Sequence, residues 1–214
     1  MTHVFNYRGS FEMHVTVCAP GALDAFRAWC EVERWKCVRI VLARGMHVDQ
    51  PMATWRRDGT VLPSVLAEAT ARAKDLDHAG FTVVRMKIEA DPSNDEVPAT
   101  DAAALLQPTC NYFEHHVKLR RAVAAGRGLL LRVCLDHAAH LSRNAWHEPA
   151  EGCEERFVTL RLYRMGRSAS EQRLHRLLGA LEGAGEQIID VESEYTVHDS
   201  NLALDAGWLP HDAP

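Results

Sequence analysis

Phe11-Glu-Met-His-Val-Thr-Val17 recurs 102 residues later as Phe113-Glu-His-His-Val-Lys-Leu119, with phenylalanine, glutamate, histidine and valine at matching places. Apolar and polar residues alternate in both copies, so each predicts a β-strand with one apolar and one polar face. A second, weaker similarity joins Ile88–Asn94 to Val191–Asn201, where glutamate and a Ser-Asn pair recur. The two similarities together indicate an internal duplication.

The order of predicted elements is the same in both halves. In the first half, the hydrophobic periods predict strands and helices in the order βαββαβ, over 11–17, 22–32, 37–43, 49–56, 62–78 and 81–90. In the second half, strands are predicted over 112–119, 156–164 and 187–197, with a helix and a strand expected by symmetry near 121–135 and 139–146. Ser168-Ala-Ser-Glu171 is typical of a capping box, and it predicts a helix that continues through Leu181.

A βαββαβ order is typical of ferredoxin-like modules. We therefore expect an α+β fold, an internal duplication of two ferredoxin-like halves whose antiparallel sheets lie about a pseudo-twofold cleft. The expected organisation is an N-terminal half over 1–95, a linker over 96–110, a C-terminal half over 111–201 and a tail over 202–214.

Composition restricts the class of protein. Of the 214 residues, 47% are hydrophobic and 25% charged, as in a soluble globular protein. No apolar run approaches the length of a membrane span or a signal peptide, so we expect a cytoplasmic protein without a membrane partner. The six cysteines form no Cys-x-x-Cys pair. Composition does not predict the oligomeric state.

The charge of the chain also restricts the kind of nucleic-acid partner that we expect. The formal net charge is -5, and the absence of a dense lysine and arginine run argues against duplex DNA. An RNA end is only a minor alternative, because RNA recognition would need aromatic residues on the open sheet face and only Tyr163 is predicted there.

The polar faces of the predicted strands carry the candidate functional residues. His14 shares a strand face with Glu12 and Thr16, and His116 shares one with Glu114 and Lys118. Three further strands present polar rows in the same way: Arg85, Lys87 and Glu89; Thr159, Arg161 and Tyr163; and Asp190, Glu192 and Glu194. A sheet face exposed to water would also be polar, but histidine, arginine and tyrosine at matching positions favour a ligand site.

Two such faces across a cleft would bring His14 and His116 to opposite walls, beside both cationic and acidic groups. That arrangement would suit a small anionic ligand. The candidate catalytic residues are His14, His116 and Lys118. The candidate substrate-binding residues are Thr16, Arg85, Lys87, Arg143, Asn144, Thr159, Arg161 and Tyr163.

A two-lobed, duplicated chain with His14-Val-Thr16 on a strand resembles the two-histidine phosphoesterases, which carry one His-x-Thr or His-x-Ser in each lobe. His116-Val-Lys118 departs from this motif at the hydroxyl position. The resemblance implies hydrolysis of a phosphodiester or cyclic phosphate, with one histidine as base, the other as acid and Thr16 on a phosphoryl oxygen. Lys118 would then offer the phosphate a point charge in place of a hydroxyl.

Two alternatives remain open at this stage. The first is a metal-dependent enzyme in which His14, His116, Glu89 and Glu194 bind a divalent metal such as Zn, Mn or Fe(II). The second is a module that senses a nucleotide or another small anion without turnover. The sequence contains no closely spaced ligand motif that would decide for the metal.

Overall fold

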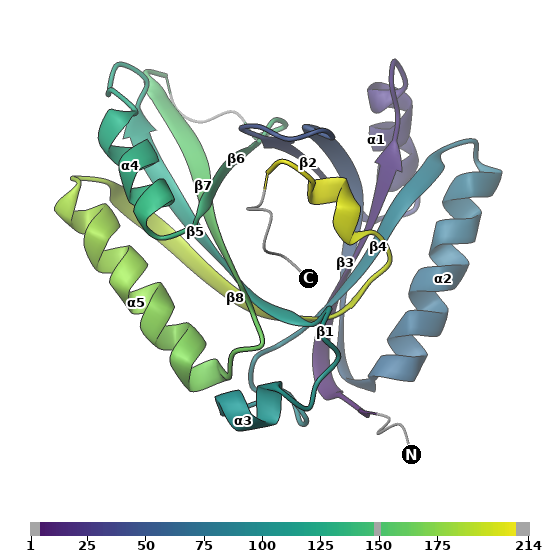
Figure 1. The fold of residues 1–214 in the computed structure, drawn as a ribbon. Coiled ribbons are helices and arrows are strands. Elements are labelled where there is room, and N and C mark those ends of the chain that lie inside the picture. The colour runs from purple at the N-terminus through teal and green to yellow at the C-terminus, as the bar shows by residue number, and fades with distance from the viewer. Residues whose placement is uncertain (1–4, 148–150, 209–214) are drawn as a thin grey trace.

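Eight antiparallel strands close into a single barrel in the computed structural model of the chain, which describes residues 5–147 and 151–208. Five α-helices lie outside the strands, so the fold is α+β (Figure 1). The elements, in chain order, are β1 (Arg8–Cys18), α1 (Leu23–Val32), β2 (Lys36–Leu42), β3 (Asp49–Val61), α2 (Leu62–His78), β4 (Thr82–Ala90), α3 (Asp101–Ala104), β5 (Tyr112–Ala122), α4 (Gly128–Asp136), β6 (His140–Asn144), β7 (Cys153–Tyr163), α5 (Arg167–Gly183), β8 (Gln187–Asp199) and the short 3₁₀ helix η1 (Leu202–Asp205).

The strand order around the barrel is β1-β3-β2-β6-β7-β5-β8-β4, and β4 pairs with β1 to close it. The first half of the chain supplies β4-β1-β3-β2, and the second supplies β8-β5-β7-β6 in the same order. The sequence predicted two sheets on either side of a cleft. Instead, β2 pairs with β6 and β4 with β8, which leaves no open edge strand and turns the expected cleft into the interior of a barrel.

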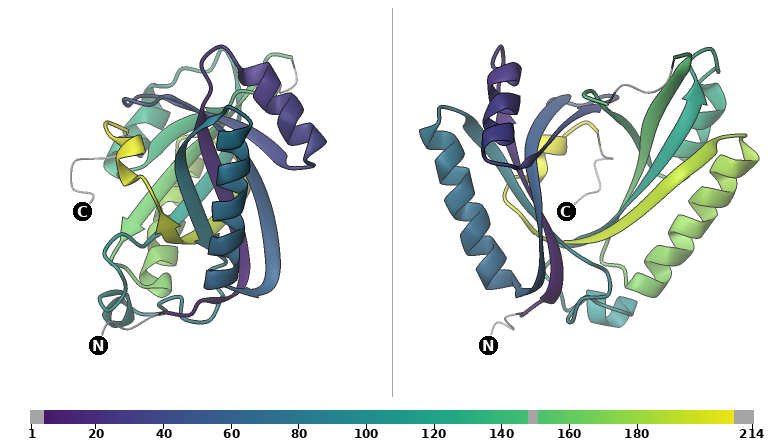
Figure 2. Two further views of the ribbon diagram at one scale, coloured as in Figure 1. Left: turned by 90° about the vertical axis from the view of Figure 1, so that its right-hand side faces the viewer. Right: turned by 180° about the vertical axis from the view of Figure 1, so that it is seen from behind.

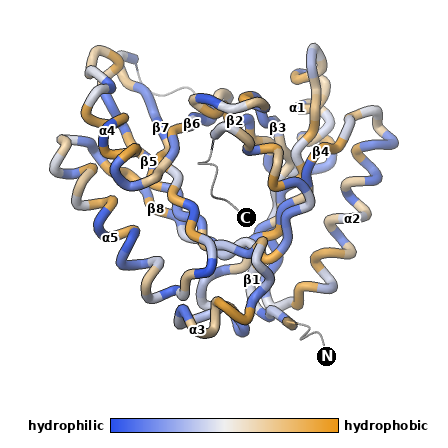
Figure 3. The backbone as a smooth tube through the Cα atoms, in the orientation of Figure 1, coloured by the Kyte–Doolittle hydropathy of each residue, from blue (hydrophilic) through white to orange (hydrophobic). Residues whose placement is uncertain are grey.

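The hydrophobic core lies between the barrel and its helices. Figure 2 shows α1 and α2 against the strands of the first half and α4 and α5 against those of the second. Alternate residues of each strand point outward to these helices, so that Met13, Val15 and Val117 are buried against residues such as Phe26 and Leu177. Figure 3 shows the mixture of hydrophobic and hydrophilic residues along helices and strands that this layering requires. The other strand face points into the barrel.

Two local predictions differ from the structure. The capping box at Ser168 is wrong, because α5 begins after Gly166 and no side chain caps it. The helix expected near 121–135 begins only at Gly128, since β5 extends to Ala122 and leaves a short turn before the helix. Within the linker the chain forms the short helix α3, whose first turn is capped by the hydroxyl of Thr100. None of the helices among the described residues is long and apolar enough to cross a membrane.

The segment after β8 folds back across one end of the barrel (Figures 1 and 2). The backbone N–H of Asn201 donates to Asp199 Oδ1 at 3.0 Å, which turns the chain at the end of the strand. Further on, the Trp208 indole N–H donates to the carbonyl oxygen of Leu141 at 3.2 Å, and Trp208 is only 5% exposed. This segment therefore forms part of the wall of the barrel interior.

The position of the core predicts which leucines matter for stability. Leu177 on α5 is 0% exposed, whereas Leu135 on α4 is 66% exposed. Leu177→Ala should lower the free energy of unfolding by about 2–5 kcal/mol, because it leaves a cavity between α5 and the barrel. The matched change Leu135→Ala should alter it by about 0.5 kcal/mol or less. Urea unfolding followed by circular dichroism measures both, and equal effects would contradict the described packing.

Candidate functional site

The interior of the barrel holds a cavity of about 220 Å³, which is room for a small molecule. One wall is apolar, with Val38, Ile40 and Leu42 on β2 and Met52 on β3. The opposite wall, formed by β1, β4, β5 and β8, is polar and titratable. It contributes Glu12, His14, Thr16, Arg85, Lys87, Glu89, Glu114, His116, Glu192 and Glu194 to the lining.

The strand register places the same residue types at equivalent positions of the two halves. His14 lies opposite Thr54, and His116 lies opposite Thr159. The glutamate two residues before each histidine is likewise flanked by an arginine and a glutamate: Glu12 lies opposite Arg56 and Glu89, and Glu114 opposite Arg161 and Glu194. The two sets of Glu, His, Thr, Arg and Glu therefore occupy equivalent register positions, and all but the exposed Arg56 line the interior.

A threonine hydroxyl orients each histidine. His14 Nδ1 lies 2.9 Å from Thr54 Oγ1, and His116 Nδ1 lies 3.0 Å from Thr159 Oγ1. Because the hydroxyl holds Nδ1, Nε2 is the ring atom turned toward the carboxylates of the interior. His14 Nε2 lies 2.7 Å from Glu89 Oε2, and His116 Nε2 lies 3.6 Å from the nearest Glu194 oxygen.

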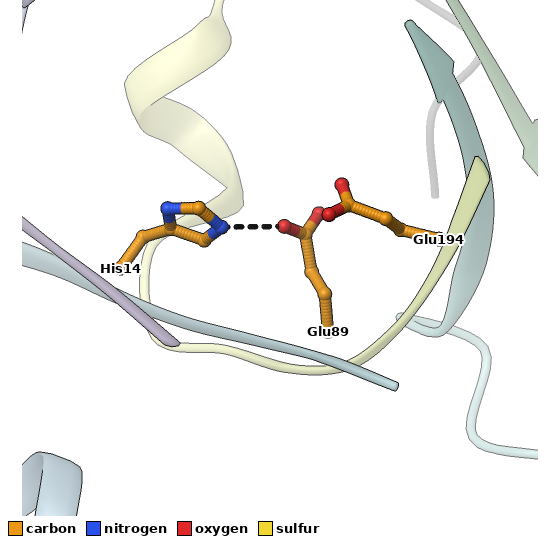
Figure 4. A group of neighbouring side chains, drawn as sticks. All are labelled: His14, Glu89 and Glu194. Atoms are coloured by element: carbon orange, nitrogen blue, oxygen red, sulfur yellow. Dashed lines mark hydrogen bonds and ion pairs between the residues drawn. The ribbon is translucent and has the colours of Figure 1, made fainter. Parts of the chain in front are cut away.

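Figure 4 shows the carboxylates of Glu89 and Glu194 turned toward one another, with the His14 ring on the other side of Glu89. The resulting row runs His14, Glu89, Glu194, His116 across β1, β4, β8 and β5. Its four members are the four residues that the sequence suggested as alternative metal ligands. The structure thus brings together side chains that lie as far as 180 positions apart in the chain.

The cations of the polar wall are already engaged in ion pairs. Lys87 contacts both Glu89 and Glu114. Arg161 Nη2 lies 2.8 Å from Glu114 and 3.0 Å from Asp205. Arg85 pairs with Asp199 at 2.5 Å and with Asp205 at 3.0 Å. These groups neutralise one another inside the barrel, where an unpaired charge would be costly.

The same contacts shift the pKa values of the row. Burial raises the pKa of Glu194, the charge of Glu89 raises it further, and it reaches about 7. Burial opposes charge on His116, but Glu194 and Glu114 outweigh it and raise its pKa to about 9. Burial also opposes charge on His14 and Glu89; the mutual contact nevertheless raises the pKa of His14 and, together with Lys87, holds that of Glu89 well below its usual range.

Not every candidate from the sequence faces this cavity. Lys118 is turned away to Glu155, with Nζ 2.6 Å from Oε2. Arg143 is exposed on β6, because its neighbours Ser142 and Asn144 are the residues that point inward. Tyr163 is not among the residues that line the cavity. Its ring lies tilted against that of Tyr112, with the ring centroids 4.9 Å apart.

Two residues of the site were not identified from the sequence. Thr54 holds His14 from the neighbouring strand, and it could have been found by pairing the predicted strands 11–17 and 49–56 in register. Asp205 is 2% exposed and lines the cavity, where it accepts from Gln50 Nε2 at 3.0 Å and contacts both buried arginines. Asp205 lies in the segment predicted as a tail over 202–214, and no strand pattern marks it.

Several sets of side chains could hold a metal ion by their proximity. In one set, ligand atoms of His14, Glu89 and Glu194 all lie within 4.8 Å of one another. A second set of the same span joins Glu89, Glu114 and His116, and a third consists only of the carboxylates Glu12, Glu192 and Glu194. Histidine with carboxylates is a donor set that suits Zn, Mn or Fe(II).

A search against protein-family models finds no match for this chain, and a search of curated proteins finds none either.

The ion-pair network predicts unequal roles for two lysines. Lys87→Met removes the cation shared by Glu89 and Glu114, and should lower the free energy of unfolding by about 3–5 kcal/mol, because two buried carboxylates lose their partner. Lys118→Met removes a pair whose lysine side chain is 25% exposed, and should cost about 1 kcal/mol or less. Thermal and urea unfolding at neutral pH compare the two. A smaller loss for Lys87→Met than for Lys118→Met would contradict the network.

Proposed function

We propose that the chain is an enzyme that acts on a small molecule held inside the barrel, and that His14 and His116 are the groups that act on it. One observation carries this proposal: two histidines at equivalent register positions, each oriented by a threonine, present Nε2 to carboxylates on the wall of one cavity. Orientation of an imidazole by a second polar group is typical of residues that transfer protons or bind ligands.

The walls of the cavity indicate the kind of substrate. The apolar residues of β2 and β3 face the polar row across a space of about 220 Å³. A small organic molecule with an apolar body and one polar end matches both walls. Its polar end would lie at the histidines, where a proton can be taken from one position and delivered to another.

A phosphate ester is the second candidate, and the two equivalent histidines favour it because paired imidazoles could supply a base and an acid at phosphorus. The cations give less support to a phosphate ester. Arg85, Lys87 and Arg161 each have carboxylate partners, so a phosphate would have to compete with those partners for them. We therefore propose a general acid–base enzyme as the first candidate and the phosphoesterase-like hydrolase suggested by the sequence as the second.

We also infer that the two halves are duplicated ferredoxin-like modules. The support is the shared strand order and the repeated set of Glu, His, Thr, Arg and Glu at equivalent positions. Under this inference the site lies at the junction of the modules, and neither half would contain a complete site by itself.

The proposed function is tested with a panel of small phosphodiesters, carboxylates and amines. Compounds that raise the Tm of the wild type are incubated with it, and products are sought by mass spectrometry. His14→Ala and His116→Ala should each lower the rate of conversion by about 100-fold or more. His175→Ala on the exposed face of α5 is the matched control and should leave the rate unchanged.

The outcomes separate the function classes. If a compound raises the Tm but is recovered unchanged after incubation with the wild type and with each variant, the result would favour a non-catalytic sensor. Conversion that survives both histidine substitutions, with circular dichroism showing the variants folded, would refute the proposed roles.

A further inference from the structure

Glu194 is a buried carboxylate whose ion-pair partner among the described residues is His116. The residue is 8% exposed, and its nearest ion-pair contact is His116 Nε2 at 3.6 Å, beyond hydrogen-bonding distance. Its carboxylate is turned toward that of Glu89 (Figure 4). Two buried carboxylates that face one another repel unless a proton or a cation lies between them. A positive group between the two carboxylates, in addition to His116 beside Glu194, would relieve this repulsion.

Lys87 does not supply that group. Its Nζ contacts Glu89 Oε1 and Glu114 Oε2, so the ammonium occupies the set formed by Glu89, Glu114 and His116. Glu89 Oε2, which faces His14 Nε2 at 2.7 Å, is on the side away from this contact. In the set of His14, Glu89 and Glu194, one imidazole nitrogen and two carboxylates lie close enough together to bind a cation, which would replace the proton between His14 and Glu89.

The surroundings of His14 suit it to metal binding. Nε2 forms a hydrogen bond with Glu89 Oε2 at 2.7 Å, and Nδ1 lies 2.9 Å from the Thr54 hydroxyl. Loss of the Nε2 proton would free its lone pair for a cation at the same place. Metal-binding histidines are commonly oriented in this way by a polar partner of the far ring nitrogen. Thr196 Oγ1 donates to Glu89 Oε1 at 3.4 Å and so helps to hold the carboxylate in place.

We propose that His14 Nε2, Glu89 Oε2 and the Glu194 carboxylate bind one divalent transition-metal cation of the Zn²⁺, Mn²⁺ or Fe²⁺ class. An imidazole ligand favours these ions over Mg²⁺ and Ca²⁺, which prefer oxygen ligands alone. Three protein ligands leave a coordination position open to the cavity, as in catalytic metal sites. His116 stays beside the cation as the proton-transfer group. The inference deepens the proposed function, and only its catalytic consequence rests on that function.

The test uses the full chain after removal of metals with a chelator and dialysis. Binding of Zn²⁺, Mn²⁺ and Mg²⁺ is measured by isothermal titration calorimetry, and Mn²⁺ also by electron paramagnetic resonance. We expect one Zn²⁺ or Mn²⁺ per chain and much weaker binding of Mg²⁺. His14→Ala should weaken Mn²⁺ binding by about 100-fold or more, and Glu194→Gln, which keeps the side-chain shape, by at least about 10-fold. Circular dichroism confirms that each variant is folded.

Glu192→Gln is the matched control, since Glu192 lies on β8 two residues before Glu194 and belongs to the all-carboxylate set at the mouth of the cavity. It should leave Zn²⁺ binding unchanged. Binding that Glu192→Gln abolishes and His14→Ala preserves would place the cation at the mouth and overturn the proposal. No binding of any of the three ions by the folded wild type would overturn it as well.

The proposed cation site and the proposed enzyme activity are overturned by different results. Metal binding that depends on His14, without conversion of any compound in the panel, would support the cation site and count against the enzyme. Conversion that persists in the chelated protein and is lost in His116→Ala would support the enzyme and overturn the catalytic role of the cation, whereas the binding measurements decide the cation site itself.

Discussion

Closure of the barrel is the constraint on which the site depends. Once β4 pairs with β8 and β2 with β6, most of the polar faces of the strands are enclosed, and the charges there can no longer be solvated as on an open sheet. Carboxylates and cations must then neutralise one another. Lys87 between Glu89 and Glu114, and Arg161 between Glu114 and Asp205, are the result. The cavity keeps its polar wall because this network is nearly complete.

The network is not symmetric, although the residues around it largely are. Position 87 on β4 is a lysine, whereas the corresponding neighbour of His116 on β8 is Glu192. One ammonium therefore pairs with Glu89 and Glu114, while Glu194 faces Glu89 and has His116 as its ion-pair partner. This difference assigns unequal roles to two otherwise similar histidines. Under the two proposals, the His14 side would bind the cation and the His116 side would transfer protons.

The C-terminal segment contributes more than its sequence suggested. Asp205 joins the two buried arginines to Gln50, and Trp208 seals the same end of the cavity. A chemical site formed only by the repeated strands would be open at this end. The described residues after β4 lead instead to α3 and β5, so the two halves of the chain differ at this point.

Much of this was determined by the sequence alone. The period of two in 11–17 and 113–119 determined that His14 and His116 leave the hydrophobic core together with Glu12 and Glu114, because side chains alternate across any strand. Only the tertiary structure decided that these faces enclose one cavity, since pairing between β4 and β8 depends on contacts between distant parts of the chain. It also decided which cations are engaged: Lys118 reaches Glu155 and Lys87 reaches Glu89. Periodicity shows the face to which a charge belongs, whereas its partner is set by the packing of neighbouring strands.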